Sequence, residues 1–289
     1  MNMSVIGMQG EKPQPDRVQA IWRYPVKSMG GEKLAETEIT ERGVHGDRAL
    51  ALVEPATNRA AVVRSWAARL FDHHARYASE PGLETALPVV RITTPDGAVL
   101  SSDQADIDQV FSAAFQRHLR LLSSAPPGLL VAFPPGTLAG KLAELTEAPL
   151  AGSAPPGTFF DAACIHLIAS ATLAHLQTAF PETSFDVRRF RPNIVVETHG
   201  APYVENDWVG RLLGIGDQVV LRVTRPCPRC VNASLAQGDL PRAPGILRAI
   251  AQHNMRDLGV AGELPCVGVY ADVVQSGRVR SGDHLRLLD

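Results

Sequence analysis

The apolar runs of this chain are short, and this constrains its fold more than any other feature. The 289 residues include 24 Gly and 22 Pro, and turns rich in these residues, Asn and Asp interrupt the apolar runs along most of the chain. Runs of that length are typical of β-strands. We expect helices over residues 104–117, 170–180 and 243–256. Many short strands with few helices favour closed β-barrels over a βαβ sheet, and no glycine-rich nucleotide loop lies between a strand and a helix.

Length and turn composition predict two domains. A chain of 31.0 kDa is long for a single core. A segment rich in Pro and Gly, residues 123–140, is the best candidate for a linker or surface excursion. The predicted division is therefore a disordered lead-in over residues 1–16, a β domain over 17–122, and a second domain over 141–289.

Composition and charge exclude several classes of protein. The hydrophobic fraction of 45% and the charged fraction of 20% are those of a globular protein. A net charge of -2 leaves no basic excess for nucleic acid, and no apolar run approaches the ~20 residues that cross a bilayer. The N-terminal residues lack a signal-peptide core, so we expect a cytoplasmic protein. Its 4 cysteines are too few for a disulfide scaffold and are expected to be free thiols.

The segment Arg225 to Cys230 reads Arg-Pro-Cys-Pro-Arg-Cys and follows an apolar strand. Its CxxC spacing allows a redox pair, half of a zinc site, or one thiolate ligand beside a spectator cysteine. A redox pair should open a helix, and a zinc site needs ligands that Cys164 and Cys266 do not supply at the usual spacing. A cysteine pair without a role is the remaining alternative. Arginines beside a thiol favour its thiolate form, which binds transition metals well.

Polar residues elsewhere suggest a binding site for a phosphate. Lys27 and Ser28 follow a short apolar strand and could grip a phosphate. Arg48 after Asp47, and Arg191 with Asn193, could equally be a surface ion pair and a turn. Taken together, a thiolate in one half of the chain and a phosphate anchor in the other suggest a metal cofactor on a phosphorylated organic carrier.

In combination these motifs resemble a known family. Tyr24 to Ser28, Gly46 to Arg48, Phe190 to Ile194, Cys227 to Cys230 and the final Gly277 to Asp283 occur in the order of the MOSC domain proteins. The chain is similar to the two-domain group that includes the mitochondrial amidoxime reducing component and its bacterial relatives. The resemblance implies an α+β protein of two β-barrel-type domains, an N-terminal MOSC-type barrel and a C-terminal MOSC barrel with a few helices.

The resemblance also implies a role for each matched residue. Cys230 would be the protein thiolate on molybdenum, beside the dithiolene of a molybdopterin. The residues that would bind the molybdopterin phosphate are Lys27, Ser28 and Arg48. Those that would hold the pterin and line the pocket are Arg191, Asn193 and Arg229. The match of residues 166–172 to a helix start, which suits an anion, adds Ser170 and Thr172.

The expected activity is that of a molybdenum-dependent oxidoreductase that reduces N-hydroxylated substrates, namely amidoximes, hydroxylamines and N-hydroxy bases. The chain carries no ferredoxin-like cysteine cluster, so electrons would come from a separate protein of ferredoxin, flavoprotein or cytochrome type. Val231 to Ser234 stand where relatives carry a Thr-Thr pair, which affects substrate range. The alternative is a cofactor carrier or a sulfur-handling module with a persulfide on Cys230 or Cys227. A binding module without catalysis is a third possibility.

Overall fold

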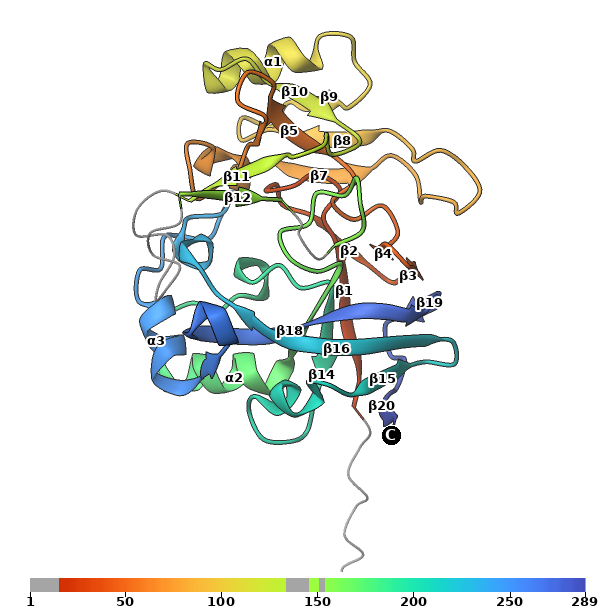
Figure 1. Cartoon of the computed structure of the whole chain (residues 1–289), viewed down its shortest axis with the longest axis vertical. Helices are drawn as coiled ribbons and strands as arrows, with labels where there is room; N and C mark the ends of the chain where they lie inside the picture. The colour runs from red at the N-terminus through yellow and green to blue at the C-terminus, as the bar shows by residue number, and fades with distance from the viewer. Residues whose placement is uncertain (1–15, 134–145, 151–153, 289) are drawn as a thin grey trace, which may run out of the picture.

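A computed structural model describes residues 16–133, 146–150 and 154–288 of the chain. It has mixed α and β structure in which sheets predominate, with three α-helices among the described residues, so the predicted α+β class is confirmed. Two stacked bodies share the long axis of the molecule (Figure 1). The lower body holds most of the C-terminal half, and the upper body holds residues from the N-terminal half.

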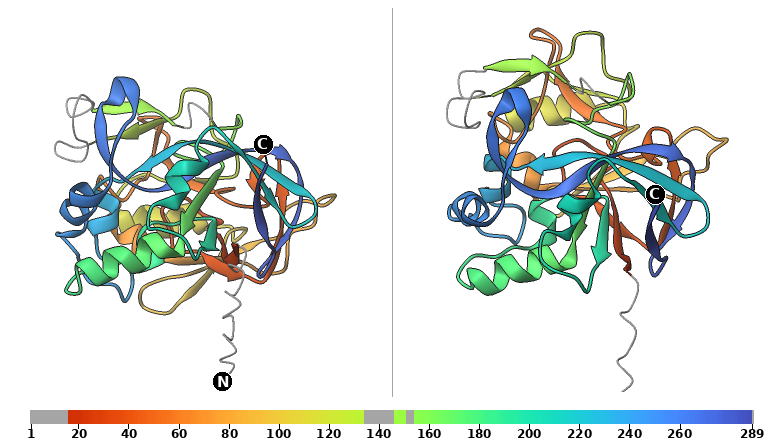
Figure 2. Two further views of the ribbon diagram at one scale, coloured as in Figure 1. Left: turned by 90° about the horizontal axis from the view of Figure 1, so that it is seen from below. Right: turned by 60° about the horizontal axis from the view of Figure 1, so that its bottom comes forward.

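The lower body is built on a nine-stranded sheet of order β2-β1-β14-β13-β18-β16-β15-β20, with β17 paired to β18. In this order the strands are β2 (Glu32–Leu34), β1 (Arg17–Arg23), β14 (Ile194–Glu197), β13 (Ile165–Ala169), β18 (Glu263–Gln275), β16 (Val219–Pro228), β15 (Leu212–Ile215) and β20 (Leu285–Leu288), with β17 at Met255–Asp257. Figure 2 shows the curvature of this sheet and two helices beside it, α2 (Ser170–Ala179) and α3 (Ile246–His253).

Strand β13 shows how the sheet separates two cores. All five of its residues are buried, and successive side chains point to opposite faces. Ile165 and Leu167 pack in the core enclosed by the curved sheet. Ile168 packs on the other face, against Leu176 of α2 and Ile250 of α3. The helices therefore cover the face of β13 that carries its even-numbered residues.

The first strands of the chain belong to the sheet of the C-terminal half. β1 pairs antiparallel with β14, with Ile21 opposite Ile194. In a separate three-stranded sheet, β3 (Glu36–Thr40) lies between β4 (Gly43–Val44) and β19 (Gly277–Arg280). The chain leaves β1 at Arg23, so these pairings place the residues that follow it at the junction of the two bodies.

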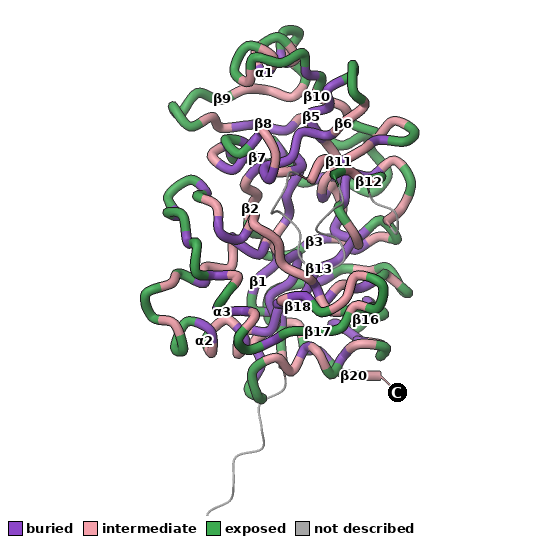
Figure 3. The backbone as a smooth tube through the Cα atoms, turned by 60° about the vertical axis from the view of Figure 1, so that its left-hand side comes forward, coloured by how far each residue is buried: buried purple, intermediate pink, exposed green. Residues whose placement is uncertain are grey.

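The upper body contains a five-stranded sheet of order β10-β5-β6-β11-β12, a three-stranded sheet β7-β8-β9 and one helix. The bounds are β5 (Ala51–Glu54), β6 (Arg59–Ala60), β7 (His74–Tyr77), β8 (Val90–Thr93), β9 (Val99–Ser101), α1 (Ile107–Phe115), β10 (Arg120–Leu122), β11 (Leu130–Ala132) and β12 (Glu147–Pro149). Helix α1 packs Ile107 and Phe111 into the core below it. Buried backbone runs through the middle of both bodies (Figure 3).

The prediction of two closed barrels needs correction, because the described residues form open sheets. Closure requires every strand to be paired on both sides, yet β2, β20, β10 and β12 end their sheets. The edges of the large sheet do approach each other. Arg17 of β1 forms an isolated bridge with His284, and Val18 N donates to Asp283 O at 2.8 Å. Leu285 N at the start of β20 also donates to Asp16 O at 2.8 Å, so a few bonds join the two ends of this sheet, although β1 and β20 are not paired along their length.

Two predicted segments fall partly outside the described residues. The lead-in over residues 1–16 is described only at Asp16. Of the predicted excursion over residues 123–140, the described part contains β11. The predicted helices are found as α1, α2 and α3, and α2 begins at Ser170 after an N-cap at Ala169. No helix in the described ranges is long and apolar enough to span a membrane.

Candidate functional site

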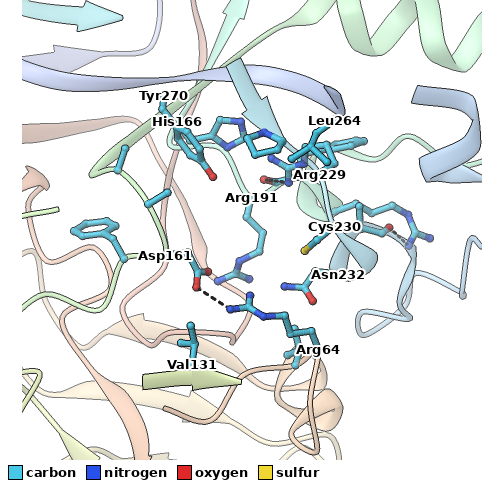
Figure 4. A pocket seen from close by; sticks show the side chains of 18 of the residues that line it. Arg64, Val131, Asp161, His166, Arg191, Arg229, Cys230, Asn232, Leu264 and Tyr270 are labelled. Carbon is cyan, nitrogen blue, oxygen red and sulfur yellow. Dashed lines mark hydrogen bonds and ion pairs between the residues drawn. The ribbon is translucent and has the colours of Figure 1, made fainter. Parts of the chain in front are cut away.

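A cavity of about 720 Å³ lies at the junction of the two bodies. This volume suits a small organic ligand. The predicted site residues that line it are Lys27, Ser28, Arg48, Arg191, Asn193, Arg229 and Cys230. The fold thus brings together residues as far apart in sequence as Lys27 and Cys230. Figure 4 shows several of them converging on one space, with Arg64, Arg191 and Cys230 facing it from different sides.

Lys27 lies in the wall of the cavity with a side chain that is only 4% exposed. Its ammonium donates to Phe159 O at 2.9 Å and lies 3.0 Å from Asp161 Oδ1. Burial lowers the pKa of Lys27 to about 8, and the carboxylate of Asp161 opposes that change. Ser28 follows in the chain, so a cation and a hydroxyl lie together at this point.

Asp47 organises the neighbouring wall. Its carboxylate forms an ion pair with Arg48 and accepts a hydrogen bond from Tyr24 N at 2.7 Å. Asn193 Nδ2 donates to Asp47 Oδ2 at 2.8 Å, and Asn193 Oδ1 accepts from His166 N at 3.2 Å. Asn193 lines the cavity, and its side-chain amide holds Asp47 and β13 in place through these hydrogen bonds.

Arg191 is held between aromatic rings. Its guanidinium lies 4.2 Å from the centre of the Tyr24 ring and 5.6 Å from that of Phe71, and Nη1 donates to Met29 O at 2.6 Å. Burial lowers the pKa of Arg191 to about 10, and the nearby charge of Arg48 acts in the same direction. The group is still a cation at neutral pH, stacked in a way that suits arginine.

The backbone at three of the predicted binding residues is left-handed. The φ angles are 70° at Ser28, 45° at Arg48 and 54° at Arg191. Left-handed backbone costs a non-glycine residue about 1–2 kcal/mol. Strain of this kind persists where surrounding contacts fix the chain, and it concentrates at binding sites. All three residues also line the cavity.

The two cysteines of the CxxC motif lie in different environments. Cys227 is the second-last residue of strand β16 and has no exposed surface. Arg229 Nη1 donates to Cys227 Sγ at 2.8 Å, and Arg229 Nη2 donates to Phe190 O at 2.8 Å. Cys230 is partly exposed and lines the cavity, at the start of a 3₁₀ turn over Val231–Ser234. The cavity-facing thiol is thus the second one.

The two arginines that flank the thiols have different partners. Arg229 bonds to Cys227, as described above. The guanidinium of Arg225 lies 5.5 Å from the centre of the Tyr270 ring. All four cysteines are free, and the described residues contain no group of three or more His, Cys, Asp and Glu side chains that could hold a metal. Within this part of the chain, nothing completes a zinc site around the motif.

Several lining residues were given no role from the sequence. They include Arg64, Asp161, His166 and Tyr270, of which only His166 lies in a matched segment, residues 166–172. The ring centres of His166 and Tyr270 are 5.6 Å apart. Burial, assisted by Arg229, holds the pKa of His166 well below its usual range, so the imidazole is neutral. Among the described residues His166 Nε2 has no hydrogen-bond partner, and neither has Arg229 Nε or Asn232 Oδ1.

Ser170 and Thr172, at the start of α2, are not among the residues that line the cavity. Ser170 Oγ accepts from Thr198 N at 3.2 Å. Thr172 is fully buried, donates to Glu205 Oε2 at 2.7 Å and accepts from Tyr203 N at 2.8 Å. These hydrogen bonds join α2 to the segment that follows β14. Both side chains therefore stabilise the fold at this position.

The cavity is strongly cationic. Its basic lining residues are Lys27, Arg48, Arg64, Arg189, Arg191, Arg229 and Arg248, against the carboxylates of Asp161 and Glu263. A cleft lined by one sign of charge attracts the opposite sign, and guanidinium groups suit phosphate. The arrangement therefore favours an anionic ligand that extends toward the thiol of Cys230.

Comparisons with known proteins show which family the chain resembles. A family model described as the MOSC domain matches residues 155–286, and one described as the MOSC N-terminal beta barrel domain matches residues 16–113. A search of curated proteins found no match.

Two solved structures illustrate the similarity. The YuaD protein of Bacillus subtilis is 11% identical, with 96% of this chain and 97% of that chain covered, and a TM-score of 0.44. YiiM of Geobacillus stearothermophilus is 18% identical, with 44% and 55% covered and a TM-score of 0.32, so the chain spans about half the length of YiiM. The two family models match consecutive parts of the chain and between them cover most of it, and the chain therefore belongs to the MOSC domain family.

Proposed function

We propose that this protein binds a molybdenum cofactor and reduces N-hydroxylated substrates with electrons from a separate protein. The observation that carries the proposal is the partly exposed thiol of Cys230 at the wall of a cationic cavity. A thiolate is a strong ligand for a transition metal, and the cations suit a phosphorylated carrier.

The chemistry of the cavity fits a molybdopterin in three respects. Lys27, Ser28 and Arg48 offer donors for a phosphate on one wall. The unpartnered polar atoms of His166, Arg229 and Asn232 are suited to the polar edge of a heterocycle, since buried polar groups normally have partners. Cys230 would be the protein ligand to the metal.

When bound, the cofactor supplies the two-electron chemistry that removes oxygen from the substrate. The residues of the chain bind and orient it and exclude bulk water. Arg191 and Arg48, stacked on Tyr24, keep positive charge beside the site throughout, and fixed cations favour the more electron-rich state of a bound redox group. Asn232 and Ala233, two of the four residues that stand in place of the family's Thr-Thr pair, line the cavity and would shape the space for substrate.

The alternative function is that of a cofactor carrier or sulfur-handling module. The position of Cys230 at the cavity wall suits a persulfide as well as a metal ligand. Cys227 is fully buried under Arg229, so a persulfide relay between the two thiols would require that bond to open. The four free thiols suit a reducing, cytoplasmic compartment for either function.

Turnover separates the two functions. The protein, expressed in a host that makes the cofactor, is supplied with a chemical reductant and benzamidoxime, and the amidine product is measured. A reductase gives many product molecules per protein. Stoichiometric transfer of the cofactor to an apo-enzyme without turnover would favour the carrier and count against the reductase.

A further inference from the structure

We propose that Asp161 is an internal counter-ion that a ligand phosphate displaces, and that Arg64 is a phosphate-binding residue of the same site. Lys27, Arg48 and Arg64 are named here the cation cradle. The inference rests on the proposed function in one respect, namely that the cavity takes a phosphate-bearing ligand. It adds two residues, Arg64 and Asp161, for which the sequence suggested no role.

The geometry places Asp161 at the centre of the cradle. Its Oδ1 lies 3.0 Å from Lys27 Nζ and 3.6 Å from Arg64 Nη2. The two cations are buried, with side chains 4% and 6% exposed, whereas the Asp161 side chain is 51% exposed. A single carboxylate oxygen on the open side of two buried cations thus occupies the position that a ligand oxygen would take.

The charges favour exchange. The three cations of the cradle are matched by only two carboxylates, because Asp47 pairs with Arg48 and Asp161 alone lies beside Lys27 and Arg64. The nearby cations, Lys27 first and then Arg64, hold the pKa of Asp161 below its usual range, so Asp161 is ionised. A phosphate monoester brings ≈ -1.5 to -2 charges and three acceptor oxygens at neutral pH. Its oxygens can therefore bond to different cations at the same time, whereas Asp161 shares the single oxygen Oδ1 between Lys27 and Arg64.

The chain around Asp161 permits the exchange. Residues 159–163 belong to no helix or strand, so the side chain can turn away without breaking a sheet ladder. Lys27 keeps its second acceptor, Phe159 O at 2.9 Å. Arg64 stays in place through the bond from Nε to Ala132 O at 3.2 Å and its position 4.3 Å from the centre of the Phe133 ring. The cations remain fixed while the counter-ion leaves.

Competition of this kind has a measurable consequence. A ligand that must displace an internal group binds with an apparent affinity reduced by the fraction of time that the group is absent. Removal of the carboxylate should therefore strengthen phosphate binding about three- to tenfold, the range expected when the displaced ion pair is worth about 1 kcal/mol. Removal of the Arg64 cation should weaken it by a similar factor.

The test is titration of the full chain, purified from a host that lacks the cofactor, with inorganic phosphate in a calorimeter at pH 6.5. Asp161→Asn keeps the shape of the side chain and removes its charge. Arg64→Met removes the cation, and Arg64→Lys preserves it in case the Met variant melts early. Glu197→Gln is the matched control, because it deletes one carboxylate from an exposed ion pair with Arg17 and changes the net charge equally.

We expect tighter binding only in Asp161→Asn, weaker binding in Arg64→Met, and no change in the control. Unchanged or weaker binding in Asp161→Asn overturns the counter-ion role, and unchanged binding in Arg64→Met overturns the role of Arg64. If wild type binds phosphate and Lys27→Ala does not, these failures leave the proposed function standing. If neither the wild type nor any variant binds phosphate, both the inference and the phosphate-binding role in the proposed function are wrong.

Discussion

The two sides of the cavity are built differently. On the anion side, Lys27, Arg48 and Arg64 are each tied to protein acceptors, by the hydrogen bonds and ion pairs described above. On the thiol side, Cys230 is partly exposed, and the polar atoms His166 Nε2 and Asn232 Oδ1 have no partner among the described residues. One side is preorganised and the other retains unused bonding capacity. A site with this division anchors a ligand at one end and leaves the other end free to react.

The largest effect should come from the two cysteines. We expect Cys230→Ala to abolish substrate reduction and molybdenum content, because it deletes the cavity-facing thiol. Cys227→Ala should keep most of the activity. It should lower the free energy of unfolding by about 1–3 kcal/mol, because it leaves a buried cavity and an Arg229 N–H group without its acceptor. Activity assays, metal analysis and urea unfolding measure these outcomes. Equal loss of activity in both variants would contradict the assignment of Cys230 as the ligand.

Lys27→Ala tests the anion side directly. The variant should lose cofactor occupancy by about tenfold, because a charge-assisted bond to the phosphate contributes on the order of 1.5 kcal/mol or more. The optical spectrum of the cofactor that remains should be unchanged, since Lys27 would bind the phosphate and not the metal. Pterin fluorescence after oxidation gives the occupancy. Full occupancy in this variant would show that Lys27 does not anchor the cofactor.

The buried ammonium of Lys27 should also give the protein a pH-dependent stability. Its pKa is lowered to about 8 from the ordinary 10.5, so between these values the unfolded chain binds more protons at this site than the folded chain does. Stability therefore rises with pH in that window, by up to about 3 kcal/mol relative to Lys27→Met. Urea unfolding of both proteins from pH 7 to 10 measures the difference. A difference that stays constant with pH would contradict the burial argument.

Two adjacent arginines give a matched test of the thiol side. Arg189 is 1% exposed and donates to three carbonyls of the segment after Cys230, those of Ala233, Leu235 and Pro241. Arg189→Met should cost about 2 kcal/mol, because these buried acceptors lose their partner. Arg188 pairs with Asp186 and Asp239 near the surface, so Arg188→Met should cost less than about 1 kcal/mol. Equal costs in thermal or urea unfolding would contradict this difference.

The smallest effect concerns the left-handed backbone. Ser28→Gly should stabilise the protein by up to about 1 kcal/mol, because glycine accepts a φ of 70° without the steric cost. It should also weaken phosphate binding slightly through loss of the hydroxyl. Thermal melting measures the gain in stability, and phosphate titration measures the loss of affinity. A destabilised Ser28→Gly protein would show that the hydroxyl, and not the strain, dominates at this position.

Much of the site could be predicted from the sequence, because its residues follow recognisable strands and turns. Lys27, Arg48, Arg191 and Cys230 each stand in a motif, and the fold brings them to one cavity. Arg64 and Asp161 could not be found in this way. Each lies in an irregular segment, and what gives them a role is their distance from Lys27, which no local pattern encodes.

The rest of the fold depended on long-range pairing. The pairing of β1 with β14 joins residues about 175 positions apart in the sequence, and a hydrophobic pattern shows that a strand exists without showing its partner. Barrel closure was over-predicted for the same reason. Ser170 and Thr172 were proposed from a helix start that suits anions, but the first turn of α2 bonds to Thr198 and Glu205.

The most direct measurement is the molybdenum and pterin content of purified wild-type protein and of Cys230→Ala, both expressed in a host that makes the cofactor. We expect nearly one molybdenum and one pterin per wild-type chain, with molybdenum lost in the variant. A folded wild-type protein that contains neither would show that the cavity does not hold this cofactor.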